Sequence, residues 1–580
     1  MKRLRWAFLL IGVAVLCLVA FTGYQALKAR DALTATSADF QQMRDELTGG
    51  DTASARETLT SAQASALLAR DNTRGPGWWL AAKLPGIGDD VAGVQTVADV
   101  ADNLASDVLP GVIDASQTLS PERLRPKNGR IDIDAIARVA PAVVSADREI
   151  QDATSRIAAL EPEDMIGQVA SPVTELQGKL TDAADLTAKA SRAVQLLPSM
   201  LGADGRRTYL VLFQNNAEIR ATGGLPGALA VMSADHGKIK MHAQGGAADL
   251  GSYDKPALPL TREERALFDT KMGIFPADSN FTPDFPRTAE LVQAMWQRAQ
   301  GQSVDGVLSA DPIALSYLLR GTGPVRLGDG AKLTADGAVQ LLLNTVYLEQ
   351  PDTELQDVFF ASAARNVFDA VSSGRGDPRK VLEGLAQAAS ERRLLMWSDD
   401  RDEQALLQPT PLAGALFTGE SDHPQIGVYL NDGTGAKLHY YVKHSVDVES
   451  LSCEGGVQKL KVTVTMSSDA PADARTLPAS VVGGGFGVKL GTVRTGVLVY
   501  GPGGGRVESA TLNGRKISIA LMTHEGRPVA NQTVDLAPGG RLKLEFLVVG
   551  DAGQTQKPAL SVTPGVRSTG VGTVTASACS

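Results

Sequence analysis

The chain of 580 residues is poor in the side chains that build redox and metal centres, with three cysteines and six histidines. It contains no CxxC motif and no cysteine or histidine pair at the spacing of a zinc site. His439 and His444 fall in one expected strand at an odd spacing, so their side chains point to opposite faces. We therefore expect no metal site.

Basic charge and catalytic motifs are also scarce. The net charge of −9 at pH 7 argues against a nucleic-acid partner, because counterion release needs a basic face. The sequence has no GxSxG elbow, no HExxH, no P-loop and no GxGxxG between a strand and a helix. The string "VVGGGFGVKLG" stands in strand-like surroundings and favours a flexible hairpin over a phosphate site.

A long uncharged run is present near the N-terminus. It extends from Trp6 to Tyr24, directly after Lys2, Arg3 and Arg5, and is long enough to cross a bilayer. The positive-inside rule keeps the basic residues in the cytoplasm and places Trp6 and Tyr24 at the two interfaces. A cleaved signal peptide is the alternative, but the run is long for one and no convincing A-x-A site follows. We predict a single-pass cell-membrane protein, with residues 1–30 as cytoplasmic tip and anchor and the bulk extracytoplasmic.

The cysteines divide between this run and the C-terminal part of the chain. Cys17 lies in the run, which leaves Cys453 and Cys579 for the outer compartment, where two thiols can pair. A bridge closing so long a loop would stabilise the fold by about 4 to 5 kcal/mol in the chain-entropy model. Two unrelated free thiols are the alternative.

Residues 31–199 have helical spacing in stretches such as "VAGVQTVADVADNLASDVL", interrupted by glycine and proline. This pattern predicts an extracytoplasmic helical stalk or bundle of roughly three to five helices. Trp78 and Trp79, set among glycines and prolines, suit either the membrane surface or the interior of the bundle. No basic cluster flanks them, which favours the interior.

The remaining residues predict two further domains of a multidomain α+β protein. Over residues 200–420, strands such as "TYLVLF" alternate with helices such as "PRKVLEGLAQAASERRLLMW", which is typical of a mixed α/β core. Over residues 421–580, alternating strands such as "VQKLKVTVTMSS" and "RLKLEFLVVG" are separated by turn residues, and we expect a β-sandwich.

A cluster of polar residues follows the apolar strand "TYLVLF". Ligands dock past the carboxyl ends of strands in sheets that helices cover, and Arg220 could hold a phosphate or carboxylate as a two-pronged donor. Alternatively these side chains satisfy backbone groups, and Glu218 pairs with Arg220 or another basic residue. The candidate ligand-binding residues here are Gln214, Asn215, Asn216, Glu218 and Arg220.

A second polar cluster precedes an expected helix in "FPADSNFTPDFPRTAELVQAMW". Asp284 or Thr282 caps this helix while Arg287 faces a pocket, and an ordered loop with a helix cap is the alternative. Asp305 and Asp311 flank the strand "GVLSA", where an acid could act as general base or cation ligand, although Asp311 before a proline is also an ordinary helix cap.

Four long stretches resemble bacterial membrane proteins grouped as domain of unknown function 4012. They are "YLVLFQNNAEIRATGGLPGALAVM", "NFTPDFPRTAELVQAMW", "VDGVLSADPIALSYLLRGTGPV" and "GVYLNDGTGAKLHYYV". The resemblance covers residues 200 to about 500. It implies a single-pass envelope protein and supplies no activity.

The core also resembles, more distantly, the LytR-CpsA-Psr ligases, which transfer glycopolymers from polyprenyl-pyrophosphate carriers to the cell wall. Their loop arginine corresponds to Arg220, and their later helical segment resembles "ELQDVFFASAAR", which gives Asp357 and Arg365. Where those enzymes carry an Asp-Thr pair this chain has Gly227 and Ala228, and "AQGGAADL" lacks their arginine.

Two functional hypotheses follow. In the first, an envelope module without cofactors binds a glycan, a lipid-linked precursor or a protein through a polar pocket around Arg220 and Arg287. In the second, a phosphotransferase moves a polyprenyl-linked glycopolymer to the cell wall, with Arg220, Arg287 and Arg365 neutralising phosphate charge and Asp284 or Asp305 accepting a proton. Only this alternative would call for Mg²⁺. Convergence of these side chains in one pocket would distinguish the two.

Overall fold

The computed structural model describes residues 2–328, 330–350, 352–417, 419, 421–484 and 486–579, with side chains described from Val13 onward. Lys2, Arg3, Arg5 and Trp6, on which the predicted orientation depends, therefore lie outside the described side chains. The chain divides into two compact units. The first comprises residues 1–124 and 132–203, and the second residues 125–131 and 204–580.

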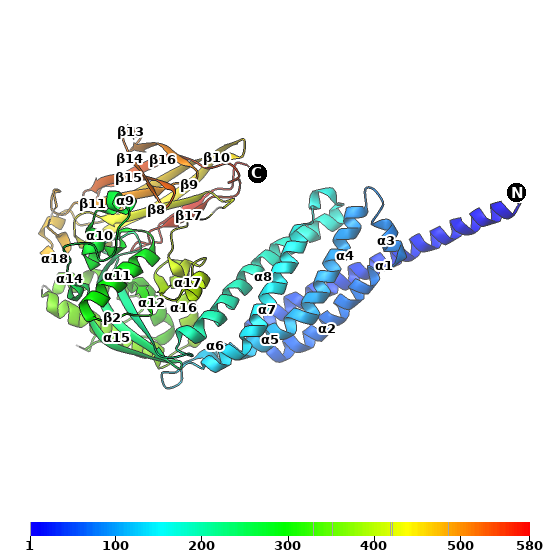
Figure 1. Ribbon diagram of the computed structural model, residues 1–580, viewed down its shortest axis with the longest axis horizontal. Helices are drawn as coiled ribbons and strands as arrows, with labels where there is room; N and C mark the ends of the chain where they lie inside the picture. Colours follow the sequence, from blue (N-terminus) through cyan, green and yellow to red (C-terminus); the bar gives the residue numbers. More distant parts are fainter. Residues whose placement is uncertain are drawn as a thin grey trace. The chain divides into compact units, whose positions relative to one another are not determined.

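The first unit consists of helices (Figure 1). Aspartates cap two of them, since Asp51 accepts from Ser54 N and Asp132 from Ala135 N, as expected for helix starts. The helices are α1 (Lys2–Gly49), α2 (Thr52–Asn72), α3 (Pro76–Ala81), α4 (Gly88–Asn103), the π-helical turn η1 (Leu104–Val108), α5 (Leu109–Thr118), α6 (Pro121–Leu124), α7 (Ile133–Ala158) and α8 (Gly167–Met200).

Helices α1 and α2 pack against each other along most of the length of α2, as do α7 and α8. The buried face of α2 is made largely of alanines, which let helices approach closely because they have no bulky side chain to accommodate. Fully buried are Ala55, Ala62, Ala66 and Ala69. The helical bundle predicted from spacing is therefore built on small residues.

The N-terminal part of α1 is apolar and exposed. The stretch from Val13 onward is long and apolar enough to cross a membrane, and only 6% of its most apolar window is buried. Leu16, Val19 and Phe21 are more than half exposed. The predicted N-terminal apolar helix is confirmed, and its length and composition suit a membrane span or a signal anchor.

The second unit contains a five-stranded mixed sheet with the order β3-β2-β1-β4-β7. β1 is parallel to β4, and the other neighbours are antiparallel. The strands are β1 (Arg207–Asn215), β2 (Leu225–Asp235), β3 (Lys238–Gly246), β4 (Gly306–Ala310) and β7 (Leu394–Ser398).

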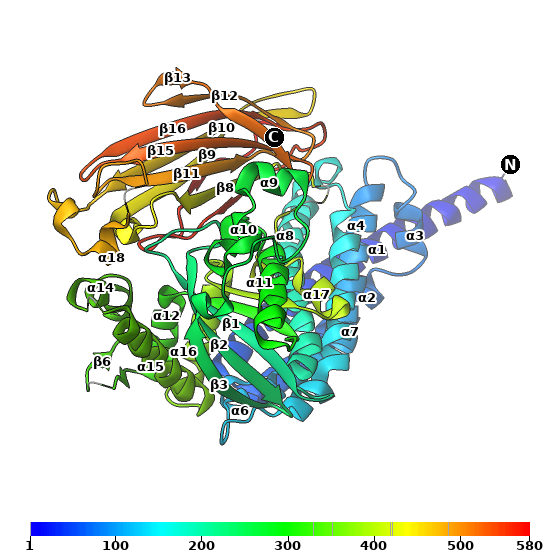
Figure 2. The same cartoon turned by 60° about the vertical axis from the view of Figure 1, so that its left-hand side comes forward.

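Helices cover both faces of this sheet (Figure 2). Leu210, Leu212 and Leu229 share a hydrophobic cluster with Phe285 of α11 (Phe285–Gln300) on one face. On the other face lie α12 (Pro312–Thr322) and α15 (Thr353–Ser372). The unit also contains α9 (Arg262–Phe268), α10 (Lys271–Ile274), η4 (Pro276–Phe281), α13 (Ala338–Gln340), η5 (Leu341–Thr345), α14 (Val346–Glu349), α16 (Pro378–Ser390) and α17 (Arg401–Leu407).

Two further sheets form the C-terminal part, with the orders β13-β12-β16-β10-β9-β18 and β14-β15-β11-β8-β17. Alternate residues of both sheets enter one hydrophobic cluster, for example Val446 and Val462 from the first and Val428 and Val497 from the second. The strands are β8 (Gln425–Asp432), β9 (Val442–Glu454), β10 (Val457–Ser468), β11 (Val493–Tyr500), β12 (Arg506–Leu512), β13 (Arg515–Ile517), β14 (Ala520–His524), β15 (Arg527–Leu536), β16 (Arg541–Val549), β17 (Ala559–Val562) and β18 (Val571–Val574). The chain is thus a mixed α+β protein with several sheets.

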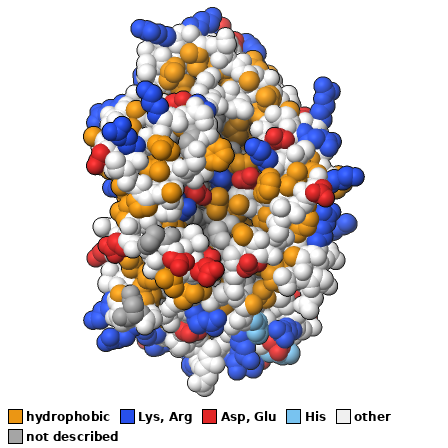
Figure 3. Space-filling model, turned by 90° about the vertical axis from the view of Figure 1, so that its left-hand side faces the viewer, with side chains coloured by type: hydrophobic (Ala, Val, Ile, Leu, Met, Phe, Trp, Pro, Cys, Tyr) orange, Lys and Arg blue, Asp and Glu red, His pale blue; other side chains and the backbone are white. Residues whose placement is uncertain are grey.

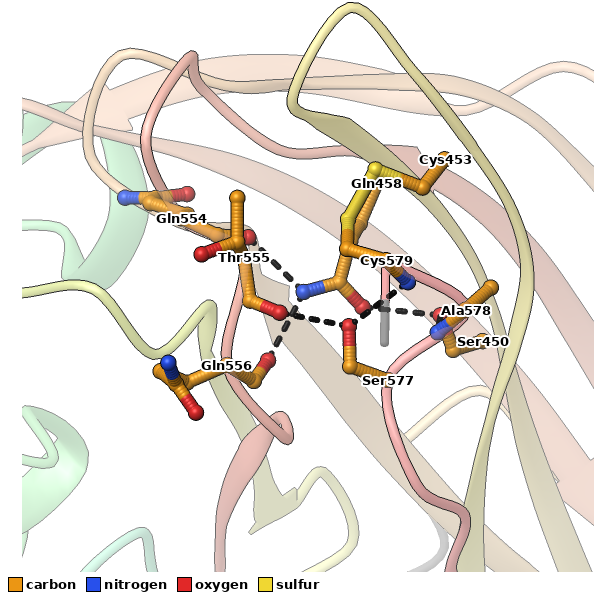
Figure 4. The surroundings of a disulfide bond; sticks show 9 residues. All are labelled: Ser450, Cys453, Gln458, Gln554, Thr555, Gln556, Ser577, Ala578 and Cys579. Atoms are coloured by element: carbon orange, nitrogen blue, oxygen red, sulfur yellow. Dashed lines mark hydrogen bonds between the residues drawn. A yellow bond between two sulfur atoms is a disulfide. The ribbon is translucent and has the colours of Figure 1, made fainter. Parts of the chain in front are cut away.

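A disulfide joins Cys453 to Cys579 across a sequence separation of 126 residues (Figure 4). Beside it, the side-chain amide of Gln458 donates to the carbonyls of Gln554 and Gln556, each at 2.7 Å. The bond and the amide together fasten the last residues of the chain to β9 and β10. Cys17 is free and exposed.

Candidate functional site

The polar segment that follows β1 is buried. Gln214, Asn216, Glu218, Arg220 and Thr222 are each at most 7% exposed. Burying polar groups is costly unless each finds a hydrogen-bond or charge partner inside the protein. The contacts of these side chains therefore decide whether the segment binds a ligand or holds the fold together.

Arg220 is surrounded by partners from its own unit. Its Nη2 donates to Asp278 Oδ1 at 3.3 Å and its Nη1 donates to the Ile219 carbonyl at 3.1 Å. Asp432 Oδ2 lies 4.0 Å from Nη1, and the Phe281 ring lies 4.8 Å from the guanidinium carbon. Two carboxylates and an aromatic face thus already compensate this cation.

The groups around Arg220 have shifted protonation equilibria because water is excluded. Burial raises the pKa of both Asp278 and Asp432, and the neighbouring guanidinium opposes the rise. Burial lowers the pKa of His439 to about 3. His439 is therefore neutral at pH 7, with Nδ1 3.5 Å from Asp432 Oδ1 and Nε2 2.9 Å from Thr495 Oγ1.

A second buried charge pair lies at the same end of β1. Arg393 Nη1 donates to Asp311 Oδ2 at 2.9 Å, and Asn216 Nδ2 donates to the same oxygen at 2.9 Å. Arg393 Nη2 also donates to the Gly565 carbonyl at 2.9 Å, and Asp311 Oδ1 caps α12 through Ala314 N at 2.8 Å. This pair joins the end of β1, the start of α12 and the C-terminal segment.

The other predicted residues of the segment contact side chains and backbone groups of their own unit. Gln214 bonds only to groups of the segment itself. Asn215 Nδ2 donates to the Tyr347 hydroxyl at 2.8 Å, and Glu218 pairs with Lys437 at 3.1 Å rather than with the neighbouring arginine. Each side chain is positioned by the fold.

Asp284 and Arg287 form the start of α11. Asp284 accepts from Arg287 N at 3.2 Å and from Leu416 N at 2.8 Å, and burial raises its pKa to about 6. Arg287 Nε donates to Glu264 at 2.6 Å and its Nη1 to Glu290 at 3.0 Å. Helix capping and ion pairing account for both residues.

Asp305, Asp357 and Arg365 lie elsewhere on the sheet. Asp305 accepts from Thr208 N at 2.6 Å, at the start of β1 and hence at the end opposite the polar segment. Arg365 donates to Gln244 Oε1 of β3 at 3.0 Å. Partial burial and nearby carboxylates raise the pKa of Asp357, which is exposed on α15.

The structure does not bring the candidate arginines together, because Arg220, Arg287 and Arg365 contact different partners.

Figure 3 shows one face hollowed near its middle, with charged side chains of both signs around the hollow. A cavity of about 450 Å³ lies among α11, β7 and α17, and no predicted site residue lines it. Among the described residues, no group of three or more His, Cys, Asp or Glu side chains is placed to hold a metal ion.

Sequence reasoning located the polar segment but missed its principal partners. Asp278, Asp432 and Arg393 were not candidates, although Asp432 ends the strand "GVYLND" much as the polar segment ends β1. Aspartates and arginines at the ends of apolar strands were the signal that could have found them. The pairing itself depends on residues 58 or more positions apart in the chain.

Comparison with known proteins assigns this region to a family. A family model described as "Protein of unknown function (DUF4012)" matches residues 204–347, which include β1, the polar segment, α11 and α12. Searches of curated proteins and of solved structures found no match. Residues 204–347 of this chain belong to the DUF4012 family of proteins of unknown function.

Proposed function

We propose that the protein is a single-pass, membrane-anchored component of the cell envelope that acts as a non-catalytic binding module. The apolar first half of α1 supplies the anchor, and the basic residues before it keep the N-terminus in the cytoplasm. The disulfide between Cys453 and Cys579 suits an oxidising compartment outside the cytoplasm.

The finer architecture belongs to the same proposal. The hydrophobic cluster shared by the two C-terminal sheets supports a β-sandwich over residues 421–580. The mixed sheet with helices on both faces supports an α/β core over residues 200–420 that resembles LytR-CpsA-Psr proteins. The helices of residues 31–199 would follow the anchor as an extracytoplasmic helical domain.

The observation that carries the non-catalytic function is the compensation of Arg220. A phosphate clamp needs arginines with unoccupied donors that face a common space. Arg220 is 5% exposed and lies between two carboxylates, while Arg287 is held by Glu264 and Glu290. Removing one partner of such a buried pair leaves the other charge buried without compensation. We therefore assign these contacts to the stability of the fold.

The ligand surface that fits best is the exposed polar group between β3 and α15. It combines Arg365, whose Nη2 donates to Gln244 Oε1 at 3.0 Å, and Gln244, whose Nε2 donates to the Ala361 carbonyl at 2.9 Å, with the nearby carboxylates of Asp249 and Asp357. Donors and acceptors arranged side by side at an exposed edge match the hydroxyl groups of a glycan. We assign the glycan, free or as part of a lipid-linked precursor, to this surface.

Mass spectrometry of glycans and lipids that co-purify with the full-length protein tests the proposal. Asp357→Ala and Arg365→Ala should each reduce the bound glycan several-fold, because both side chains are exposed and can be removed without unfolding the chain. Glu383→Ala, an exposed charge on α16, is the control and should retain it. Equal amounts in all variants would reject this surface.

The phosphotransferase alternative makes a different prediction for the same material. Incubated with a polyprenyl-pyrophosphate-linked glycan, a peptidoglycan acceptor and Mg²⁺, the wild type would join the glycan phosphate to an acceptor hydroxyl and release polyprenyl phosphate if it were such an enzyme. We expect no release above that of heat-inactivated protein. Release that disappears in Arg365→Ala would replace the binding module by the enzyme.

A further inference from the structure

The short helix α3 and the loop after it expose apolar side chains in a tight group. Trp79 is 59% exposed, Leu80 47%, Leu84 52% and Ile87 43%. Isolated exposed apolar residues are ordinary, but several close together within one short loop mark a surface with a partner. The adjacent Trp78, by contrast, is 5% exposed and packs into the helical unit. The predicted interior position is therefore confirmed for Trp78 and is wrong for Trp79.

This loop lies against α1 where the apolar stretch ends. A Cβ atom on Gly77 would come within 1.9 Å of Thr22 Oγ1, so the α3 backbone touches α1 at that level. Figure 1 shows α3 at the end of the helical unit from which the N-terminal part of α1 projects. A span of about 20 residues crosses a hydrocarbon core of about 30 Å, which puts residue 22 at its outer boundary.

Two aromatic and lysine pairs occur at this level. Lys83 Nζ lies 3.7 Å from the centre of the Trp79 ring, and Lys28 Nζ lies 5.2 Å from the centre of the Tyr24 ring. Tryptophan and tyrosine collect at membrane interfaces, and lysine extends its ammonium group from there toward water. The loop therefore repeats, on a second segment, the arrangement found at the end of the α1 apolar stretch.

The charges around the loop show which force would act. Arg74 is paired with Asp99 at 2.7 Å, and the two basic residues of the segment 74–90 are matched in number by Asp89 and Asp90. The segment therefore carries no net basic charge to attract anionic headgroups. Burial of apolar area in the headgroup and acyl boundary is then the driving term.

We infer that the loop formed by residues 76–87 inserts into the outer interface of the lipid bilayer and acts as a second membrane contact beside α1. The inference rests on the membrane anchor proposed above. It fixes the orientation of the helical unit, because one span alone would leave the unit free to tilt, whereas two contacts at the same depth restrict the tilt. The occupant of the exposed patch is the bilayer itself, including a zwitterionic one.

Depth-dependent fluorescence quenching tests this with the full-length chain. In a Cys17→Ala background, where Cys453 and Cys579 are joined, single cysteines are introduced by Leu84→Cys, Val19→Cys and Leu186→Cys and labelled with an environment-sensitive dye. All three positions are exposed. The proteins are placed in phosphatidylcholine nanodiscs with or without lipids that carry a nitroxide near the headgroup.

We expect emission at position 84 to fall several-fold more than at position 186, which lies far along α8, and position 19 to report the lipid-embedded helix. Quenching at position 84 equal to that at position 186, with position 19 embedded, would overturn the interfacial loop and leave the anchor intact. A dye at position 19 that behaves as in water would overturn the anchor as well. The two failures are thereby distinguished.

Discussion

The polar segment at residues 214–224 and the apolar loop at residues 76–87 differ in opposite ways from ordinary loops. The first is charged and buried, and its charges are paired inside the protein, while Arg220 Nε and Asn216 Oδ1 are buried without a hydrogen-bond partner among the described residues. The second exposes four large apolar side chains at the end of a helical unit. Each segment is unusual for its composition: the polar one is charged yet buried, and the apolar one is hydrophobic yet exposed.

This contrast indicates where function should be sought. A buried arginine between carboxylates stabilises one arrangement of the chain, since the charges would be costly without each other. Exposed apolar side chains raise the free energy of the protein in water, and covering them lowers it. Composition alone marked the polar segment as the functional lead, whereas burial assigns it to the fold and assigns the apolar loop to an external contact.

The largest expected effect follows removal of the cation from the polar segment. Arg220→Met leaves Asp278 and Asp432 buried without their partner and should reduce the opening free energy of the second unit by about 3 to 5 kcal/mol. Hydrogen exchange of peptides from β1 and β8 measures this quantity. Arg365→Met, which removes an exposed arginine, should change it by less than about 0.5 kcal/mol. Similar values for the two variants would remove the structural role of Arg220.

A smaller loss of stability is expected when Asn216, the uncharged side chain that donates to Asp311, is removed. Asn216→Ala deletes one of the two donors to Asp311 Oδ2 and should cost about 1 to 3 kcal/mol, the usual range for a buried acceptor that loses a partner. Denaturant unfolding, monitored by tryptophan emission, gives the difference in the free energy of unfolding between the wild type and the variant. Asn366→Ala, which loses bonds nearer the surface, should cost less, and a reversed order would contradict the account.

The pH dependence of stability has a defined sign at Asp284. Its pKa rises from 3.8 in the unfolded chain to about 6 in the fold, so its contribution is fully present below pH 3.8 and is lost as the pH rises through 6. Relative to that of Asp284→Asn, the free energy of unfolding of the wild type should fall by up to about 2 kcal/mol between pH 4 and 7. Unfolding of both proteins across this range checks it. A difference that stays constant, or grows with pH, would show that Asp284 is not buried as described.

The smallest effect is expected in the apolar loop. Trp79→Ser should change the stability of the detergent-solubilised protein by no more than about 0.5 kcal/mol, because the side chain is 59% exposed. Trp78→Ser, at the adjacent buried position, should cost about 3 to 5 kcal/mol. Thermal unfolding of the first unit compares them directly. Equal losses would mean that both tryptophans belong to the bundle interior.

The sequence was informative wherever a pattern is local. Uncharged length predicted the apolar helix, alternation predicted strands such as β16, and helical spacing predicted α7 and α8. The partners of Arg220 could not be predicted, because Asp278 and Asp432 come from segments that only the folded chain brings together. Trp78 and Trp79 are neighbours in sequence but are 5% and 59% exposed, a difference that depends on the packing of α3 in the helical unit and that no local pattern distinguishes.

We hold that the polar segment is a buried structural element and not a ligand site. Amide hydrogen exchange over residues 214–224 in the wild-type protein tests this claim most directly. The amides of the segment donate inside the fold, for example Ala221 N to Asn431 Oδ1 at 3.0 Å and Gly224 N to Gln214 Oε1 at 2.9 Å. The account predicts exchange as slow as that of β1, with or without added glycan. Exchange as fast as that of an exposed loop, slowed when glycan is added, would contradict it and restore the segment as a ligand site.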